Sequence, residues 1–118
     1  MENAPWPVEL RVNKDRNALR VTFDDGGTFD LPAELLRVMS PSAEVQGHSA
    51  EERVTVPGKR AVKIVRLEPV GTYAARIVFD DGHDTGLYTW TYLRELGEGA
   101  EVRWHSYLEE LAAKGLSR

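Results

Sequence analysis

The sequence contains no cysteine among its 118 residues. Without a thiol, the chain cannot form a disulfide, use a cysteine nucleophile, or hold zinc or an iron–sulfur cluster through cysteine. A chain without cysteine is compatible with a reducing compartment. We therefore expect a cytoplasmic location.

Basic residues and long apolar runs are also scarce. Fifteen Lys and Arg stand against 19 Asp and Glu, a net charge of −4, which argues against nucleic-acid partners and against docking on anionic membranes. No apolar run approaches the roughly 20 residues of a membrane-spanning helix. Residues 1–10 include acid and proline but no apolar segment, so they do not predict a signal peptide. With 42% hydrophobic residues, we expect one domain over residues 1–118, with a core domain over about 6–97.

The chain contains an internal repeat. Residues 19–26 resemble residues 75–82, and both stretches end in Asp-Asp-Gly. Each copy is followed by a short segment with one leucine, Leu31 or Leu87, and then by a helix-like stretch. Asp-Gly between apolar strands is a strong hairpin signal, because glycine adopts positive φ easily. The pattern predicts an α+β fold with a mostly antiparallel sheet, built from two related strand–turn–strand–helix halves and a C-terminal helix.

Periodicity and punctuation place the expected elements. Alternating apolar residues predict strands over 8–12, 19–23, 29–31, 62–67 and 73–79, with a possible edge strand at 53–56 inside the loop 40–57. Helices are predicted over 33–39, over 89–96 with Thr89 as N-cap and Gly97 as terminator, and over about 99–114. The last helix is expected to present one apolar face, formed by Val102, Tyr107, Leu108, Leu111 and Ala112.

The second Asp-Asp-Gly turn carries most of the candidate chemistry. Asp81, His83 and Asp84 lie close together in sequence, and carboxylates with imidazole can bind a metal. The alternative is a β-turn whose aspartates bond the local backbone, and the first copy supports it by having the same acids but Gly27 in place of the histidine.

Two histidines and two serines extend this candidate site. His83 is the residue that turn geometry does not explain, and near neutral pH an imidazole can donate, accept or ligate. His48 lies in the polar loop that also contains Ser40 and Ser42. A hydrolytic triad from these serines, a histidine and an aspartate is disfavoured, because the chain has no Gly-x-Ser-x-Gly nucleophile elbow.

Aromatic residues are the other candidate binding groups. Tyr88, Trp90 and Tyr92 follow the second turn, and Trp6 lies near the start of the chain. Most should be core, and Tyr88 and Tyr92 are spaced to share a helix face. Any exposed part of this group is expected to be a partner site, because aromatics with polar tips anchor interfaces.

Several stretches together resemble one known family. They are residues 6–11, 23–26, 31–37, 40–48, 68–73 and 79–93, of which the last is the most specific. They are similar to the gamma-butyrobetaine hydroxylase-like N-terminal domain, a family of unknown function that occurs alone in many bacteria. Related domains precede a 2-oxoglutarate dioxygenase domain or are joined to iron–sulfur carrier ATPases.

The resemblance also implies a metal site that this sequence has lost. In the hydroxylase the domain holds zinc through three cysteines and one histidine, and the aligned positions here are Ser40, Ser42, Val45 and His83. Serine is a poor zinc ligand and valine is none, so we expect no zinc and no other cofactor. His83 is then expected to approach the loop from Ser40 and to form a hydrogen bond where the metal stood.

These observations favour a small non-catalytic binding module that acts through a protein partner. The resemblance suggests partners in iron–sulfur or oxygenase metabolism. The candidate interaction or ligand site comprises His83, Asp81, Asp84, Tyr88, Trp90, Tyr92, Ser40, Ser42 and His48. The alternative is a metal-binding or small-molecule-binding protein, an enzyme included, centred on His83.

Overall fold

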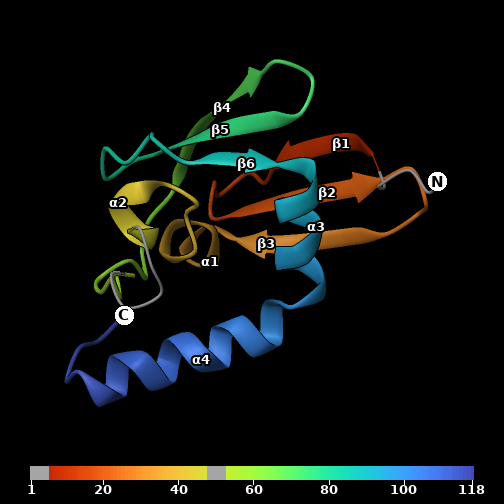
Figure 1. The fold of residues 1–118 in the computed structure, drawn as a ribbon. Coiled ribbons are helices and arrows are strands. Elements are labelled where there is room, and N and C mark those ends of the chain that lie inside the picture. Colours follow the sequence, from red (N-terminus) through yellow and green to blue (C-terminus); the bar gives the residue numbers. More distant parts are fainter. Residues whose placement is uncertain (1–5, 48–52) are drawn as a thin grey trace.

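The computed structural model describes residues 6–47 and 53–118, and within these ranges the chain forms six strands and four helices (Figure 1). In chain order they are β1 (Pro7–Val12), β2 (Ala18–Phe23), β3 (Thr28–Pro32), α1 (Ala33–Val38), α2 (Ala43–Gln46), β4 (Ile64–Val70), β5 (Ala74–Phe79), β6 (Leu87–Thr89), α3 (Trp90–Glu98) and α4 (Ala100–Ala113). Strands and helices follow one another in each half, which confirms the α+β class and the C-terminal helix.

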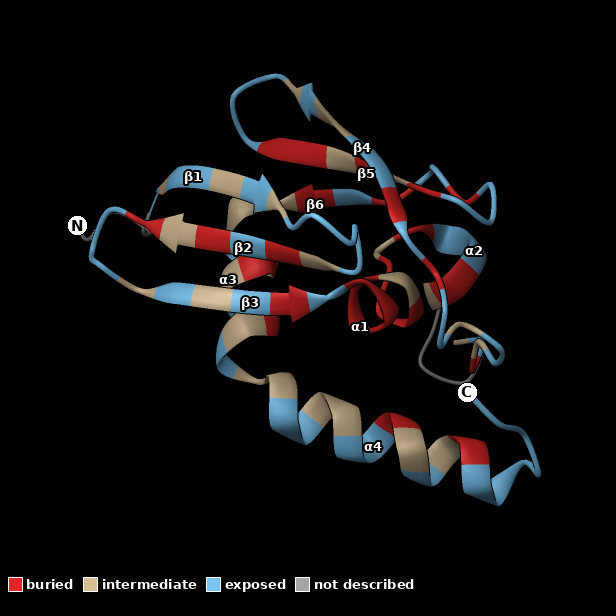
Figure 2. Cartoon of the chain, turned by 180° about the vertical axis from the view of Figure 1, so that it is seen from behind, coloured by how far each residue is buried: buried red, intermediate tan, exposed pale blue. Residues whose placement is uncertain are grey.

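The described strands make two separate antiparallel sheets, ordered β1-β2-β3 and β4-β5-β6. Each half of the chain thus builds one three-stranded sheet and then enters a helix, α1 or α3. Figures 1 and 2, which view the molecule from opposite sides, place α3 on one face of the first sheet. The repeat seen in the sequence is therefore a repeat of architecture, although the strands divide between two sheets.

The register of the two sheets differs by one residue. Leu19 pairs with Leu31 in the first sheet, whereas Ala75 pairs with Tyr88 in the second. The expectation that Leu87 matches Leu31 is wrong, since Leu87 is 37% exposed and Tyr88 is fully buried. The second connection is longer by one residue, and in a strand this shift exchanges the inward and outward faces.

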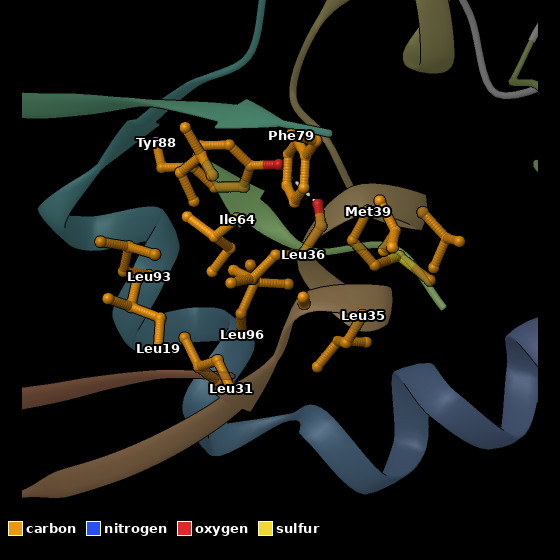
Figure 3. Close-up of a cluster of buried hydrophobic side chains, with 14 of the residues drawn as sticks. Leu19, Leu31, Leu35, Leu36, Met39, Ile64, Phe79, Tyr88, Leu93 and Leu96 are labelled. Atoms are coloured by element: carbon orange, nitrogen blue, oxygen red, sulfur yellow. Dashed lines mark hydrogen bonds between the residues drawn. The ribbon is translucent and has the colours of Figure 1, made fainter. Parts of the chain in front are cut away.

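The core lies between the two sheets and the helices α1 and α3. Figure 2 shows the buried residues gathered on β2, β5, β6 and α1, and Figure 3 shows how their side chains meet. The largest fully buried members include Leu19, Phe23, Leu31, Leu35, Leu36, Ile64, Ile77, Phe79, Tyr88, Leu93, Leu96 and Tyr107. Residues from both halves contribute, so neither sheet buries its apolar face alone.

Helix α3 begins as predicted but ends later. The Thr89 hydroxyl accepts the Tyr92 N–H at 3.1 Å, which is an N-cap. Gly97 does not end the helix, which continues to Glu98. A Cβ on Gly97 would lie 2.5 Å from Cγ of Phe29, so the glycine is required for the close approach of α3 to β3.

Helix α4 presents a different face from the one predicted. Tyr107 and Leu111 are buried as expected, but Val102 is 72% exposed and Ala112 is exposed as well. The packed face of α4 consists of Ala100, Trp104, Tyr107, Leu108 and Leu111. The aromatic ring of Trp104 takes the place that the prediction gave to Val102.

The segment from Arg53 to Val56 is not a strand in the structure. Side chains of α4 hold it instead. The Tyr107 hydroxyl donates to the Val56 carbonyl at 2.6 Å, and the Thr55 hydroxyl donates to Glu110 at 3.0 Å. None of the helices in residues 6–47 and 53–118 is long and apolar enough to cross a bilayer.

Candidate functional site

A cluster of polar side chains joins the α1–α2 region to the second Asp-Asp-Gly turn, and we call it the polar corner. Its members are Ser40, Ser42, Glu44, His83 and Thr85. Ser40, Ser42 and Glu44 lie in the segment that follows α1 and forms the start of α2, whereas His83 and Thr85 follow β5. His48, the remaining candidate from this loop, lies outside the described residues.

The His83 ring is at the centre of the polar corner. Its Nε2 is 2.8 Å from the Ser40 hydroxyl, and its Nδ1 is 3.3 Å from Oε2 of Glu44. The Ser40 oxygen also accepts the backbone N–H of Ser42 at 3.2 Å. Because the Glu44 carboxylate can only accept, Nδ1 of the neutral ring is assigned the proton. Nε2 is then an acceptor, and the Ser40 hydroxyl donates to it. Histidine and serine thus satisfy each other in the interior.

Burial lowers the pKa of His83 below its usual value. The desolvation of the charged ring is the largest cause, and the nearby Arg37 guanidinium adds to it, while Glu44 and Asp81 act in the opposite sense. Only 6% of His83 is exposed. The neutral ring is therefore the form that the fold favours at neutral pH.

A second bond links the same two segments. The hydroxyls of Ser42 and Thr85 are 2.7 Å apart, and Ser42 also caps α2 by accepting the Glu44 N–H at 3.2 Å. Ser40 and Ser42 are both buried. The loop between α1 and α2 is thus tied to the second turn at two points.

Asp81 is committed to the turn and to two cations. One carboxylate oxygen accepts the His83 N–H at 3.0 Å, and the other lies 2.7 Å from both the Arg37 and the Lys59 side chains. Burial opposes ionisation of this carboxyl, but the bonds from Lys59, the His83 backbone and Arg37 prevail and lower its pKa to about 2. Asp84, in contrast, is exposed and does not join this group.

Tyr88 and Tyr92 both support helix α1 rather than sharing one helix face. Tyr88 lies on strand β6, and its hydroxyl donates to the Leu36 carbonyl at 2.5 Å (Figure 3). Tyr92 lies on α3 and donates to the Met39 carbonyl at 2.5 Å. Burial raises the pKa of both phenols. The predicted helical pairing is wrong because Thr89, which starts the helix, lies between them.

Trp90 belongs to a different group, which we call the aromatic surface and which consists of Trp6, Tyr73 and Trp90. The Trp6 and Trp90 rings meet edge to face with centroids 6.3 Å apart. The Trp90 indole donates to the Thr72 carbonyl at 2.8 Å, and its backbone N–H donates to the Tyr73 carbonyl at 3.2 Å. Trp6 is 51% exposed and Tyr73 is 53% exposed. The sequence prediction placed Tyr73 in the strand over 73–79 and not among the candidate binding residues. This placement is wrong, because Tyr73 lies in the turn just before β5, where strand alternation no longer applies.

Comparison with known families identifies the chain. The family model described as gamma-butyrobetaine hydroxylase-like, N-terminal, matches residues 10–94. The chain belongs to this family. The resemblance read from the sequence is thereby confirmed. No curated protein matches the chain in the corresponding search.

Solved structures show the same fold in other members. Two solution structures determined by NMR superpose with a TM-score of 0.85 each, at 46% and 44% identity. The alignments cover 98% and 100% of this chain, and 91% and 88% of the others. A crystal structure from Acidithiobacillus ferrooxidans, described as a DUF971 family protein of unknown function, gives a TM-score of 0.64 at 40% identity and covers 77% of this chain and 91% of its own. These similarities place the chain in a family whose function is unknown.

The side chains of this gamma-butyrobetaine hydroxylase-like domain do not fit a zinc ion. The family resemblance implies zinc ligands at the positions of Ser40, Ser42, Val45 and His83. These side chains offer two hydroxyls, one imidazole and, at the valine, no ligand group. Both hydroxyls and the imidazole already bond one another or Thr85. In the described part of the chain, no group of three acidic or histidine residues could hold a metal ion. The donor set of this family member suits a hydrogen-bonded corner.

The order Ser40, His83, Glu44 matches the connectivity of a hydrolytic triad, but the space around it does not suit catalysis. Ser40 is fully buried, and a Cβ on Gly86 would lie 2.5 Å from its hydroxyl and 3.0 Å from the Tyr88 ring. A substrate carbonyl therefore has no room beside the hydroxyl. The triad expected from the sequence combined a serine with an aspartate, whereas in the structure the acid is Glu44, which α2 brings to the ring.

Apart from Asp84, which is exposed, and His48, which lies outside the described residues, the predicted site residues divide among three places. Ser40, Ser42 and His83 meet in the polar corner, with Asp81 beside it. Tyr88 and Tyr92 hold α1, and Trp90 faces the aromatic surface.

Proposed function

We propose that this chain is a non-catalytic binding module that acts through a protein partner, and that the aromatic surface is the contact. The observation that carries the proposal is the exposure of Trp6, whose ring packs on Trp90, and of Tyr73, whose backbone carbonyl bonds Trp90. The other aromatic side chains of the domain are largely committed to the core. Large aromatic side chains on a surface are typical anchors of protein interfaces.

The polar groups support a binding role over a catalytic one. The Ser40 hydroxyl, the His83 imidazole and the Glu44 carboxylate of the polar corner bond one another, and Ser40 is out of reach of solvent. General acid–base or nucleophilic catalysis needs such groups to meet a substrate. Their role here is to fix the loop after α1.

The aromatic surface is also held in place before any partner arrives. The Trp90 side chain is fixed by the hydrogen bond from its indole to the Thr72 carbonyl, and the Trp6 ring packs edge to face on the Trp90 ring. Side chains that are already ordered lose less entropy on binding. A partner with a pocket for an indole ring and a phenol is the expected type. Proteins of iron–sulfur and oxygenase metabolism, which the family resemblance suggests, are the first partners to try.

The proposal is tested by comparing tagged variants in cells of the source organism. Trp6→Ala and Tyr73→Ala remove exposed rings, and each is expected to weaken capture of the same crosslinked partner by at least about tenfold, the loss typical of an interface anchor. Val65→Ala is the control, because Val65 is an exposed side chain on β4. Equal capture by all four proteins, or equal loss with Val65→Ala, contradicts the proposal.

One observation favours the alternative of a small-molecule-binding protein or enzyme, namely the Ser40–His83–Glu44 connectivity. An activated serine would react with a fluorophosphonate probe, and Ser40→Ala would abolish labelling. We expect no labelling of the wild-type protein at Ser40, because its hydroxyl is buried. Stoichiometric labelling there would replace our proposal by the enzymatic one.

A further inference from the structure

An open groove runs between the α1–α2 region and the start of helix α4. Its volume is about 420 Å³, and its apolar lining includes Met39, Pro41, Tyr92 and Val102. Val102 is 72% exposed, although it lies on a helix whose opposite side packs on the core. We call this feature the α2–α4 groove. It is distinct from the aromatic surface.

Two guanidinium groups line the same groove. Arg103 lies over the Tyr92 ring, 5.8 Å from its centroid, and forms no ion pair with any residue in the described ranges. Arg53 pairs with Glu110. Arg53, Arg103 and Tyr92 line the same groove, and both positive charges act to lower the pKa of the Tyr92 phenol against the larger effect of burial.

The charges of the groove are opposite to those of the molecule. The chain carries a net charge of −4. Among the described residues, Glu110 pairs with Arg53, which lines the groove, and Glu95 opposes the arginines at Tyr92. Within residues 6–47 and 53–118, Arg103 thus has no ion-pair partner, and it lies beside an apolar surface. A carboxylate attached to an aliphatic group complements both features.

We propose that the α2–α4 groove binds a short acidic and aliphatic segment of a protein partner, with a carboxylate on Arg103 and an aliphatic side chain on Val102. A small-molecule site would enclose most of its ligand. Here the valine stands open on a helix surface, which an extended peptide can cover and a small anion cannot. The proposal is independent of the aromatic surface and can hold even if that contact is wrong.

The test uses the full chain and two blocked tripeptides, leucine–glutamate–leucine and leucine–glutamine–leucine, followed by NMR of the backbone amides. The glutamate peptide is expected to shift the signals of Tyr92, Val102 and Arg103 in a saturable way. The glutamine peptide should bind at least about tenfold more weakly, because it lacks the charge-assisted bond. Sodium butyrate, a small carboxylate, is expected to bind far more weakly than the glutamate peptide.

Variants locate the two parts of the contact. Arg103→Gln should weaken the binding of the glutamate peptide by about tenfold, so that the groove no longer prefers it to the glutamine peptide. Val102→Ser changes an exposed position, so it does not endanger folding. It should weaken the binding of both peptides by the same factor. Arg20→Gln is the control, since Arg20 pairs with Asp30 on the first sheet.

Three outcomes overturn the inference. They are the absence of shifts at the groove, equal binding of the two peptides, and binding of butyrate as tight as that of the glutamate peptide. The last outcome would identify a small-anion site. None of them bears on the crosslinking experiment with Trp6 and Tyr73, so the two proposals fail separately.

Discussion

The two Asp-Asp-Gly turns, residues 24–27 and 80–83, have the same backbone and different surroundings. Gly26 and Gly82 adopt φ values of 89° and 90°. In both turns the second aspartate accepts an N–H from the residue two positions later, at 2.9 Å in the first and 3.0 Å in the second. The second acid of each copy is therefore explained by turn geometry, as the repeat suggested. The first acid instead accepts a backbone N–H from a distant segment, Asp24 from Trp6 at 3.1 Å and Asp80 from Lys63 at 3.0 Å.

The surroundings separate the two turns. The Asp25 side chain is 43% exposed and pairs with Arg94, whose guanidinium also lies over two phenylalanine rings. The Asp81 side chain is 17% exposed and is held by both Arg37 and Lys59. The same local motif thus serves as a surface link in one half and as a partly buried charge cluster in the other.

These surroundings explain which residue stands at the fourth position of each turn, Gly27 in the first and His83 in the second. A Cβ on Gly27 would lie 2.8 Å from a terminal nitrogen of Arg94, so the arginine occupies the space of a side chain there. In the second turn this position is His83, whose ring enters the polar corner and meets Ser40. The comparison shows that one turn motif can be adapted by a single residue to tie two segments together.

The largest expected difference between the turns comes from their second aspartates. Asp81→Ala leaves Arg37 and Lys59, whose side chains are largely buried, without this carboxylate partner. It should lower the free energy of unfolding by about 3 kcal/mol. Asp25→Ala breaks an exposed pair and should cost much less. Urea unfolding of both variants measures the difference, and equal losses would show that burial does not distinguish the turns.

A second variant separates charge from turn geometry. Asp81→Asn keeps an oxygen for the His83 N–H but removes the charge, so its loss isolates the ion pairs. The pKa of Asp81 is about 2 in the folded chain, below the 3.8 of the free group, so its stabilisation is present above about pH 4 and is lost as the pH falls towards 2. Asp81→Asn should therefore abolish this part of the acid dependence.

The next effect comes from the space beside the polar corner. Gly86→Ala would place a Cβ 2.5 Å from the Ser40 hydroxyl and 3.0 Å from the Tyr88 ring, both of which are buried. We expect a loss of about 2 kcal/mol in the free energy of unfolding, typical of overpacking. The matched change in the first half is Gly27→Ala, where the contact is the flexible end of Arg94. A smaller loss at Gly27, measured by thermal unfolding, would confirm that only the second turn is rigidly packed.

Local chemistry made much of this fold predictable. The turns at Gly26 and Gly82 require positive φ, and the cap at Thr89 needs only a hydroxyl before a helix. The contact of His83 with the segment after α1 was also expected, although from the family resemblance. The turns and the cap were predictable because each depends on residues that are close in sequence. The His83 contact was predictable because the related domain already has a contact between these two segments.

Features that depend on distant packing were not predictable in the same way. Gly97 has the identity of a helix terminator, and only its contact with Phe29 explains why the helix continues. The one-residue register difference that buries Tyr88 is set by the longer second connection and by the space beneath α1. Glu44 became a partner of His83 only because Ser42 starts a short helix beside the turn.

The smallest effect that we predict is a pH dependence that the second turn has and the first lacks. The folded chain lowers the pKa of His83, so between that value and the 6.5 of the free group the unfolded state binds more protons. The stabilisation is therefore complete above about pH 6.5 and is lost as the pH falls through the folded pKa. The slope for one group cannot exceed about 1.4 kcal/mol per pH unit.

Urea unfolding from pH 7.5 to pH 5 should show this slope in the wild type and lose it in His83→Gln. The groups that face the ring are Glu44, Asp81 and Arg37, and the Asp81 carboxyl titrates well below this range. A slope that survives in His83→Gln would assign the effect to another group and remove the pH difference between the two turns.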